Sequence, residues 1–287
     1  MARPHIEFIQ SQVLPWDDGV YGGGWSGVET RILSKDGAGG DASLLVRYPA
    51  GWSRPGAEHL LADEELFVLD GAIEISGAVY GRHCYAHLPA GYLRTDAKTE
   101  GGAVVLTFYS TNPEVRTGIP QPGLYDKALL VHRLSTLEMP WDDRPFDRPL
   151  DPNIGSRPSN KTLWHDPRTG EWTFLVAAMA QSFPDGYAGM VETHPVVEEM
   201  YLLSGELIGN TGIMQPGAYF WRPPYIEHGP YGTLTGWMGL FRGKGGEMEN
   251  IWTDHKVPFT FTPAYNPALP PELADLAPHA APGTRCY

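Results

Sequence analysis

An internal repeat constrains this chain more than any other feature of its sequence. Residues 64–71 read Glu-Glu-Leu-Phe-Val-Leu-Asp-Gly, and residues 198–205 read Glu-Glu-Met-Tyr-Leu-Leu-Ser-Gly, 134 positions further on. The tetrapeptide Pro-Trp-Asp-Asp also occurs twice, at 15–18 and at 140–143. Self-similarity at a fixed spacing is the mark of duplicated structural units, so the sequence predicts two homologous domains.

Each half contains short apolar segments separated by turns that are rich in glycine and proline. The chain has 34 Gly and 27 Pro but only 19% charged residues, which favours an all-β protein with many turns over a helical one. Spacings near ten residues are typical of antiparallel sandwich or barrel strands. A weak helical period is present only at 271–277. The expected strands are Ser43–Tyr48, Glu65–Leu69, Ala103–Tyr109, Trp172–Ala178, Met200–Leu203 and Gly236–Phe241.

The turn-forming segments predict four regions. Residues 1–112 are expected to form the first barrel with a leading arm, and residues 161–264 the second barrel. Between them, 113–160 is expected to be a linker and crossover, because 111–126 carries several proline breakers. The irregular stretch at 142–158 is too long for a bare connector, so it crosses between the barrels or rims a pocket. Residues 265–287, rich in Pro and Ala, are expected to form an extended tail.

Charge and cysteine content limit the partners and the compartment. Lys and Arg number 21 against 34 Asp and Glu, a net charge of −13 without a basic stripe, which argues against nucleic acids and anionic membranes. Cys84 and Cys286 define neither a disulfide framework nor a metal-binding pair. The N-terminus lacks the apolar run of a signal peptide, and no stretch is long enough to span a membrane. We therefore expect a soluble cytoplasmic protein with a small-molecule substrate.

The second half contains four residues whose chemistry suits a metal ion. Glu192 and His194 are two positions apart and Glu198 follows four later, so along one strand all three would share a face if no bulge intervenes. His228 follows about thirty residues later, after a turn-rich return. Imidazoles and carboxylates from neighbouring strands are common ligands of Fe, Mn, Ni or Zn. The alternative is that the four are buried polar residues that hydrogen-bond to one another without a metal.

Arg222 lies close to this group in the sequence. It precedes Pro223 and could either bind an anionic substrate or pair with an aspartate on a neighbouring strand. The sequence leaves both readings open.

These residues resemble the two motifs of the cupin superfamily. The first motif is Gly, then His-x-His, three or four residues, Glu, six residues and Gly; the second is Pro-x-Gly-x-x-His. In the second half they are present as Gly189, Glu192-Thr-His194, Glu198 and Gly205, followed by Pro223-Pro-Tyr225-Ile-Glu-His228. In the first half they are present as Gly51, Ala57-Glu-His59, Glu64 and Gly71, followed by Pro89-Ala-Gly91-Tyr-Leu-Arg94.

The wording around these motifs is most similar to the cupin domain of zinc-binding anti-sigma factors and to bicupins of unassigned function. The resemblance covers roughly residues 30–110 and 160–243. It implies two tandem cupin-type double-stranded β-helix (jelly-roll) barrels, with ligands lining the inside of a barrel. Dimerisation through sheet edges is expected too, because bicupins often form homodimers and exposed edge strands gain by pairing.

The resemblance implies that only the second half holds a metal. That half keeps three of the four family ligands, His194, Glu198 and His228, while Glu192 replaces the first histidine. A carboxylate at that position can bind the cation or, as an alternative, act as a general base. We therefore expect one divalent transition metal per chain, either Fe, Mn, Ni or Zn.

In the first half, Ala57 and Arg94 stand where the family has histidines. An arginine keeps its proton and cannot ligate a metal, but it can supply positive charge to Glu64. Our hypothesis is an ion pair between Arg94 and Glu64, joined by His59, in place of the metal. The alternative is that Arg94 points to solvent and the pocket is simply filled.

Three functions remain compatible with the sequence. The first is a metal-dependent non-haem dioxygenase that acts on a small diketone or phenolic substrate, which the two-histidine, carboxylate set favours. The second is a metal-dependent isomerase, hydrolase or lyase in which Glu192 is the base. The third is a non-catalytic ligand-sensing or metal-sensing protein, as the anti-sigma resemblance implies.

Overall fold

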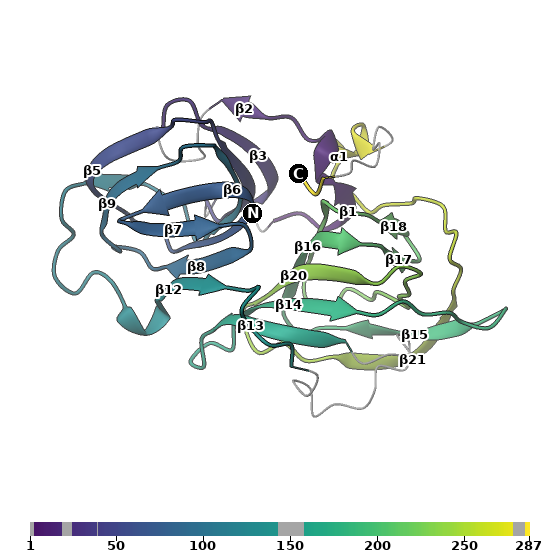
Figure 1. The fold of residues 1–287 in the computed structure, drawn as a ribbon. Helices are drawn as coiled ribbons and strands as arrows, with labels where there is room; N and C mark the ends of the chain where they lie inside the picture. Colours follow the sequence, from purple (N-terminus) through teal and green to yellow (C-terminus); the bar gives the residue numbers. More distant parts are fainter. Residues whose placement is uncertain (1–2, 19–24, 39, 143–157, 278–284) are drawn as a thin grey trace. The chain divides into compact units, whose positions relative to one another are not determined.

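The computed structural model describes residues 3–18, 25–38, 40–142, 158–277 and 285–287 (Figure 1). The chain divides into two compact units, each built almost wholly of antiparallel strands. Unit 1 comprises Met1–Arg3, Leu14–Met139 and Tyr287, and unit 2 comprises Pro4–Val13 and Pro140–Cys286. Within the described ranges, no helix has the length and apolar character needed to cross a membrane.

Unit 1 is organised around one long strand, β6 (Glu64–Ile75). The first part of β6 pairs with β8 and β10, and the second part pairs with β7 and β9, so β6 joins two groups of strands (Figure 1). Such a curled, corner-forming strand is typical of a jelly-roll barrel. The other strands are β2 (Asp17–Asp18), β3 (Glu29–Lys35), β4 (Ala42–Tyr48), β5 (Ser53–Leu60), β7 (Ala78–Gly81), β8 (Cys84–Leu88), β9 (Arg94–Lys98), β10 (Ala103–Tyr109), β11 (Val115–Thr117) and β12 (Val131–Ser135).

Unit 2 contains a six-stranded sheet in the order β1-β19-β16-β20-β14-β13, together with two two-stranded sheets, β15-β21 and β17-β18. Its apolar core includes Phe174, Met200, Phe220 and Phe241. The strands are β1 (Ile6–Gln10), β13 (Ser159–His165), β14 (Trp172–Ala178), β15 (Ala188–Thr193), β16 (Val197–Gly205), β17 (Leu207–Gly209), β18 (Gly212–Met214), β19 (Ala218–Arg222), β20 (Trp237–Lys244) and β21 (Ile251–Pro258). The short helix α1 (Pro271–Ala274) lies within the expected helical segment.

The six expected strands are confirmed as β4, β6, β10, β14, β16 and β20. Five of them begin and end within three residues of the predicted ends, whereas β6 continues for six residues past Leu69, to Ile75. Short apolar runs bounded by turn residues placed them correctly, because most side chains of these strands are buried. The predicted all-β fold of two cupin-type barrels is also confirmed.

The N-terminal arm differs from its predicted place. The sequence assigned the arm to the first barrel, whereas β1 pairs with β19 and residues 4–13 belong to unit 2. In unit 1, the strand that pairs with β8 is β12, which lies in the segment predicted to be a linker. Both β1 and β12 precede a Pro-Trp-Asp-Asp sequence, so each unit takes this strand from a corresponding place in the repeat. Strand pairing between distant segments leaves no local pattern from which it could be predicted.

Other boundaries differ for similar reasons. β11, within the expected linker, pairs with β5 of unit 1. The expected tail is tied to unit 2 by two backbone hydrogen bonds between Glu7 and Ala268. Most of the irregular stretch 142–158 lies outside the described residues; Asp142 forms a β-bridge with Asn160.

The repeated glycine at the end of the first motif predicts a measurable difference in stability. Gly205 has φ +75°, and a Cβ atom there would lie 2.0 Å from the carbonyl oxygen of Gly236; the equivalent Gly71 is as tightly enclosed, at 2.1 Å from Gly102 O. The substitution Gly205→Ala should therefore lower the free energy of unfolding by at least about 3 kcal/mol, measured by urea denaturation.

Gly186 provides the matched control. Its φ is +74°, but a Cβ atom there meets nothing within 4 Å. Gly186→Ala should cost only the left-handed backbone penalty, about 1–2 kcal/mol. Equal losses at the two positions would contradict the steric explanation.

Candidate metal centre

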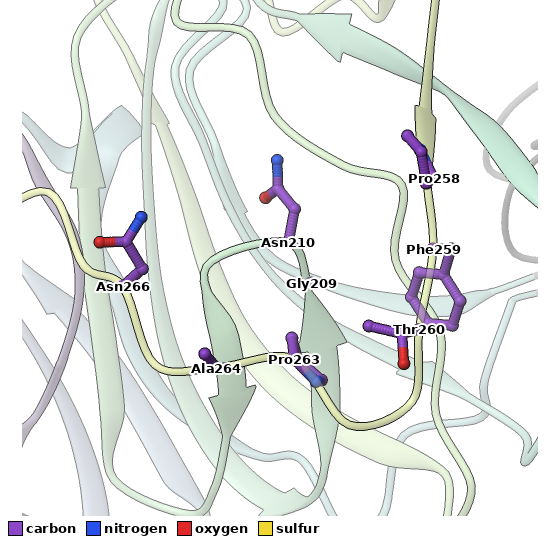
Figure 2. A pocket seen from close by; sticks show the side chains of 8 residues that line it. All are labelled: Gly209, Asn210, Pro258, Phe259, Thr260, Pro263, Ala264 and Asn266. Atoms are coloured by element: carbon purple, nitrogen blue, oxygen red, sulfur yellow. The ribbon is translucent and has the colours of Figure 1, made fainter.

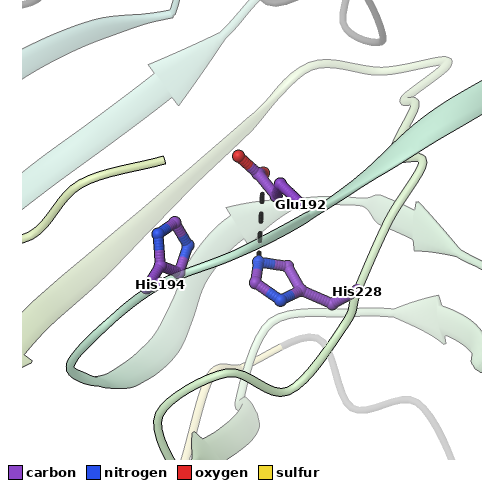
Figure 3. Close-up of side chains that lie close together, drawn as sticks. All are labelled: Glu192, His194 and His228. Carbon is purple, nitrogen blue, oxygen red and sulfur yellow. Dashed lines mark ion pairs between the residues drawn. The ribbon is translucent and has the colours of Figure 1, made fainter. Parts of the chain in front are cut away.

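The structure brings the four expected residues of unit 2 together. Ligand atoms of Glu192, His194 and His228 all lie within 4.8 Å of one another (Figure 3). Glu198 joins them, with Oε1 at 3.6 Å from His194 Nε2 and Oε2 at 3.6 Å from His228 Nε2. Glu192 Oε1 lies 3.9 Å from His228 Nε2. Two imidazoles and the Glu192 carboxylate therefore form one cluster inside unit 2, and the Glu198 carboxylate lies beside its two histidines.

The route by which the chain reaches this geometry differs from the expected single strand. β15 ends at Thr193, and β16 begins at Val197 in a different sheet, so His194 lies in the turn between them. Pro195 follows His194, and a proline has no N–H for a strand ladder and restricts the residue before it. The residues converge because the chain changes sheet between them, and not because they share one face of a strand.

Both histidines present the same ring nitrogen to the site. His194 Nδ1 lies 2.9 Å from the carbonyl oxygen of Glu249, and His228 Nδ1 lies 2.9 Å from that of Ile226. Each Nδ1–H can thus donate to a backbone carbonyl, which leaves the Nε2 lone pair free to accept. Histidine ligands of metals are usually oriented by such a bond.

His228 is suited to remain neutral. Burial lowers the pKa of its imidazole well below the ordinary value, and the positive charge of Arg222 lowers it further. Its Nε2 is buried and has no hydrogen-bond partner among the described residues. An unsatisfied buried acceptor of this kind fits a metal ligand.

One carboxylate oxygen of Glu192 is held by a hydrogen bond, and the side chain is partly accessible to solvent. Asn250 Nδ2 donates a hydrogen bond to its Oε2, and the side chain is 12% exposed, against 8% for Glu198 and 4–5% for the two histidines. Glu192 is therefore the member of the group that is most accessible from outside.

Arg222, at the end of β19, neutralises part of the negative charge of the nearby carboxylates. Its Nη1 donates to Glu198 Oε2 at 2.5 Å, and its Nε and Nη2 donate to the two carboxylate oxygens of Glu7. Burial opposes the charge of Arg222, but Glu7, Tyr231 and Glu198 together raise its pKa well above the ordinary value. Of the two readings left open for Arg222, the structure shows pairing with acidic residues, and these are glutamates and not an aspartate. The guanidinium is buried, so it is not placed to bind an anionic substrate.

The charges of this group do not balance. Glu7, Glu192 and Glu198 carry three negative charges and Arg222 carries one positive charge, so the net charge is −2 while the two imidazoles are neutral. A buried excess of negative charge is costly unless a cation compensates it. A divalent cation would supply the missing charge.

The corresponding place in unit 1 is balanced without a metal. Arg94 Nη2 lies 2.6 Å from Glu64 Oε2, both side chains are buried, and Tyr109 donates a hydrogen bond to Glu64 Oε1. The expected Arg94–Glu64 ion pair is therefore present, and Arg94 does not point to solvent. His59 does not join it in the described contacts: its Nδ1 lies 3.3 Å from the carbonyl oxygen of Gly118.

Glu58 is a member of this group that the sequence analysis missed. In the strand registers Glu58 lies opposite Arg94, just as Glu192 lies opposite His228, so Glu58 and not Ala57 is the counterpart of Glu192. The constant spacing of 134 residues between repeats was the signal that could have identified it. Glu58 is paired with Arg54 at 2.5 Å, which makes two carboxylates and two guanidinium groups in unit 1.

Tyr225 occupies the position of the glycine in the second cupin motif. It has φ +64°, which is unusual for a residue with a side chain, and its backbone N–H donates to the carbonyl oxygen of His194 at 2.8 Å. Its side chain is 65% exposed. The backbone of Tyr225 thus helps to fix His194, while its ring is free to contact another molecule.

A groove of about 310 Å³ lies elsewhere in unit 2 and contains none of the predicted site residues (Figure 2). It reaches Pro258, which pairs with Ala188 at one end of the β15–β21 ladder, whereas Glu192 pairs with Trp252 at the other. Four residues of β15 separate Ala188 from Glu192, a distance of roughly 13 Å in an extended strand. The lining residues are Gly209, Asn210, Pro258, Phe259, Thr260, Pro263, Ala264 and Asn266.

Comparison with known proteins supports the fold. The family described as "Domain of unknown function (DUF4437)" matches residues 20–245. A search of curated proteins found no match.

Among solved structures, the chain is similar to a Nostoc punctiforme PCC 73102 protein described as a "putative dioxygenase", with TM-score 0.72 and 17% identity over 90% of this chain and 91% of that one. It is also similar to Bacillus subtilis oxalate decarboxylase, in a structure whose description refers to Mn(II) centres, with TM-score 0.50 and 12% identity over 86% and 79%. The third is YlbA from E. coli, with TM-score 0.52 and 16% identity over 83% and 90%. At these identities the similarity establishes the cupin-type fold.

The ion pair of unit 1 leads to a prediction about stability. Arg94→Met leaves Glu64 buried without its partner and should lower the free energy of unfolding by about 3–5 kcal/mol, measured by urea denaturation. The double substitution Glu64→Gln with Arg94→Met removes both charges and should recover most of the loss. The metal content of the chain should not change in either variant, and metal loss would contradict the separation of the two sites.

Proposed function

Because this chain belongs to the DUF4437 family and has a cupin-type fold, we propose that unit 2 is a metal-dependent enzyme centre and that unit 1 is its metal-free counterpart. The observation that supports this division most strongly is the difference in charge balance between the two sites. The centre of unit 2 has a net charge of −2 with neutral imidazoles, whereas two arginines balance two glutamates in unit 1. A divalent cation is thus favoured in one unit and unnecessary in the other.

The residues of unit 2 fit such a cation. His194 and His228 offer Nε2 lone pairs that are oriented through their Nδ1 atoms, and Glu198 offers Oε1 while Oε2 is held by Arg222. Glu192 completes the set as a fourth ligand or stands beside it as a base. Two histidines with carboxylates suit Fe, Mn, Ni or Zn. When bound, the cation supplies oxygen activation if it is redox-active and Lewis-acid catalysis if it is not.

The reaction we favour is a non-haem dioxygenase reaction on a small diketone or phenolic substrate. The ligand set is compatible with it, and the similar Nostoc punctiforme protein is described as a "putative dioxygenase". The exposed ring of Tyr225, whose backbone is bonded to His194, offers a surface on which a phenolic ring could stack.

A second candidate is a metal-dependent isomerase, hydrolase or lyase. It is favoured by Glu192, which is the most accessible carboxylate of the group and is oriented through Oε2 by Asn250. A carboxylate held at one oxygen can accept a proton at the other. The similarity in fold to oxalate decarboxylase is compatible with this chemistry.

Metal analysis combined with oxygen uptake tests the proposal. Protein purified without chelator should contain about one divalent transition metal per chain. Oxygen consumption with a diketone or catechol panel would favour the dioxygenase, and turnover without oxygen would favour the second candidate. Bound metal without any turnover would favour a sensing role, and a chain without metal affinity would contradict the proposal.

The ligands can be tested one at a time. His194→Ala and His228→Ala should each remove most of the bound metal, because each deletes a neutral nitrogen donor. His59→Ala is the matched control: His59 is as buried as these residues but lies in unit 1, so metal content should not change. Equal metal loss in all three variants would contradict the assignment to unit 2.

Glu192→Gln separates the two roles of Glu192. If Glu192 is a base, the variant should keep its metal and lose turnover by about 100-fold or more. If Glu192 is a ligand, the affinity for the metal should fall as well. Metal content by elemental analysis and the rate of turnover, measured on the same preparation, decide between the roles.

A further inference from the structure

The N-terminal strand carries a buried carboxylate next to the candidate metal centre. Glu7 lies on β1, and its Oε1 and Oε2 accept hydrogen bonds from Nη2 and Nε of Arg222. Both side chains are almost completely buried, at 8% and 3% exposure. His5 also approaches Glu7, with its Nε2 3.5 Å from Glu7 Oε2. Glu7 therefore binds the same guanidinium that binds Glu198.

Glu7 restricts what Arg222 can do for Glu198. The Nε and Nη2 atoms of Arg222 are engaged by Glu7, Nη2 also contacts the hydroxyl of Tyr231, and only Nη1 reaches Glu198. The ring of Phe220 lies 3.5 Å from the guanidinium carbon and limits its rotation. As a result Arg222 holds Glu198 by Oε2 alone, and Oε1 remains directed toward His194.

On the premise of the metal centre proposed above, we propose that Glu7 is a positioning residue for the cation site. It cancels the charge of Arg222 and keeps the guanidinium from binding both oxygens of Glu198. Without this counter-charge, the unbalanced Arg222 would draw Glu198 into a closer, two-oxygen ion pair. Glu198 would then be a poorer ligand, and the group would repel a cation more strongly.

In unit 1, both oxygens of the corresponding carboxylate have a contact. Glu64 is bound directly by Arg94 through one oxygen and by Tyr109 through the other. The position opposite Glu64 that corresponds to Arg222 is Leu88, so no arginine there requires a second carboxylate. The centre of unit 2 keeps a carboxylate oxygen available because Glu7 shares the guanidinium.

The backbone around Glu7 is anchored independently of its side chain. Glu7 and Ala268 exchange two backbone hydrogen bonds of 2.7 and 2.8 Å, and Tyr265 donates a hydrogen bond to the carbonyl oxygen of Phe8. Ile6 and Ile9 lie opposite Trp221 and Tyr219 of β19. A change of the Glu7 carboxylate can therefore be made while β1 stays in place.

The experiment is a Co(II) titration of the full-length chain after removal of metal with a chelator. Binding is followed by calorimetry, and the geometry of the bound ion by its visible absorption. Glu7→Gln should bind Co(II) about 10–100-fold more weakly than the wild type, with a changed absorption band, because residues beyond the ligands typically have effects of this size. Glu7→Asp, which keeps the charge, should lose less affinity.

A double variant distinguishes charge from structure. Glu7→Gln combined with Arg222→Gln removes one negative and one positive charge, so the net charge of the group returns to −2. The double variant should bind Co(II) more tightly than Glu7→Gln alone. If Glu7 were only structural, the second substitution would add a further loss.

Glu199→Gln is the matched control. Glu199 is buried, and it binds Arg242 at 2.6 Å and the hydroxyl of Tyr219 at 2.5 Å, but it is adjacent to Glu198 on the strand and therefore points to the other face. The Glu199→Gln substitution should lower the free energy of unfolding but leave the Co(II) affinity within about threefold of the wild type. Circular dichroism of every variant shows whether it is folded.

The outcomes separate the two proposals. A wild-type chain that binds no Co(II) contradicts the metal centre itself. A wild-type chain that binds Co(II), with Glu7→Gln and Glu7→Asp binding equally well, contradicts only the role of Glu7. A double variant weaker than Glu7→Gln overturns the charge-balance explanation as well.

Discussion

The buried carboxylate of the first motif is the constraint on which both units depend. Glu64 and Glu198 occupy equivalent places, and both are nearly inaccessible to solvent. Removing a carboxylate from water costs several kcal/mol unless a positive charge and hydrogen bonds compensate it. Each unit meets this requirement with an arginine, but the arginine comes from a different strand position. The chemistry available to each unit follows from that difference.

In unit 1 the arginine takes the place of one of the predicted metal ligands. Arg94 occupies the position that His228 has in unit 2, so the positive charge replaces a metal ligand. Tyr109, which lies opposite Glu64 on β10, has Gly243 as its counterpart opposite Glu198 on β20. Unit 1 therefore has charge balance and a filled interior, features that favour stability over binding.

In unit 2 the arginine lies on the neighbouring strand and is shared. Arg222 binds both Glu198 and Glu7, so its single positive charge leaves an excess of negative charge around the cluster of Glu192, His194 and His228. The fold alone does not identify the reaction, because similar cupin-type structures are described with different activities. The residues that would distinguish the reactions are those at the accessible side of the group, Glu192 and Tyr225.

Features that depend on local patterns could be predicted from the amino-acid sequence alone. Strands β4, β6, β10, β14, β16 and β20 follow from short apolar runs and the turn residues between them, because such runs are buried whichever strands they pair with. The repeat identified Glu64 as the equivalent of Glu198. The cupin motifs identified Glu192, His194, Glu198 and His228, which lie close together in the structure. The Arg94–Glu64 pair was predictable because a buried carboxylate in a motif that lacks its histidine requires a cation.

The pairings between distant segments could be seen only in the folded protein. Glu7 and Arg222 are 215 positions apart, and nothing in the sequence around Glu7 indicates that β1 pairs with β19. The change of sheet at His194 and the pairing of Glu58 with Arg54 are also set by strand registers. Such contacts form only after both segments have packed, so their energy depends on the whole unit and leaves no periodic trace along the chain.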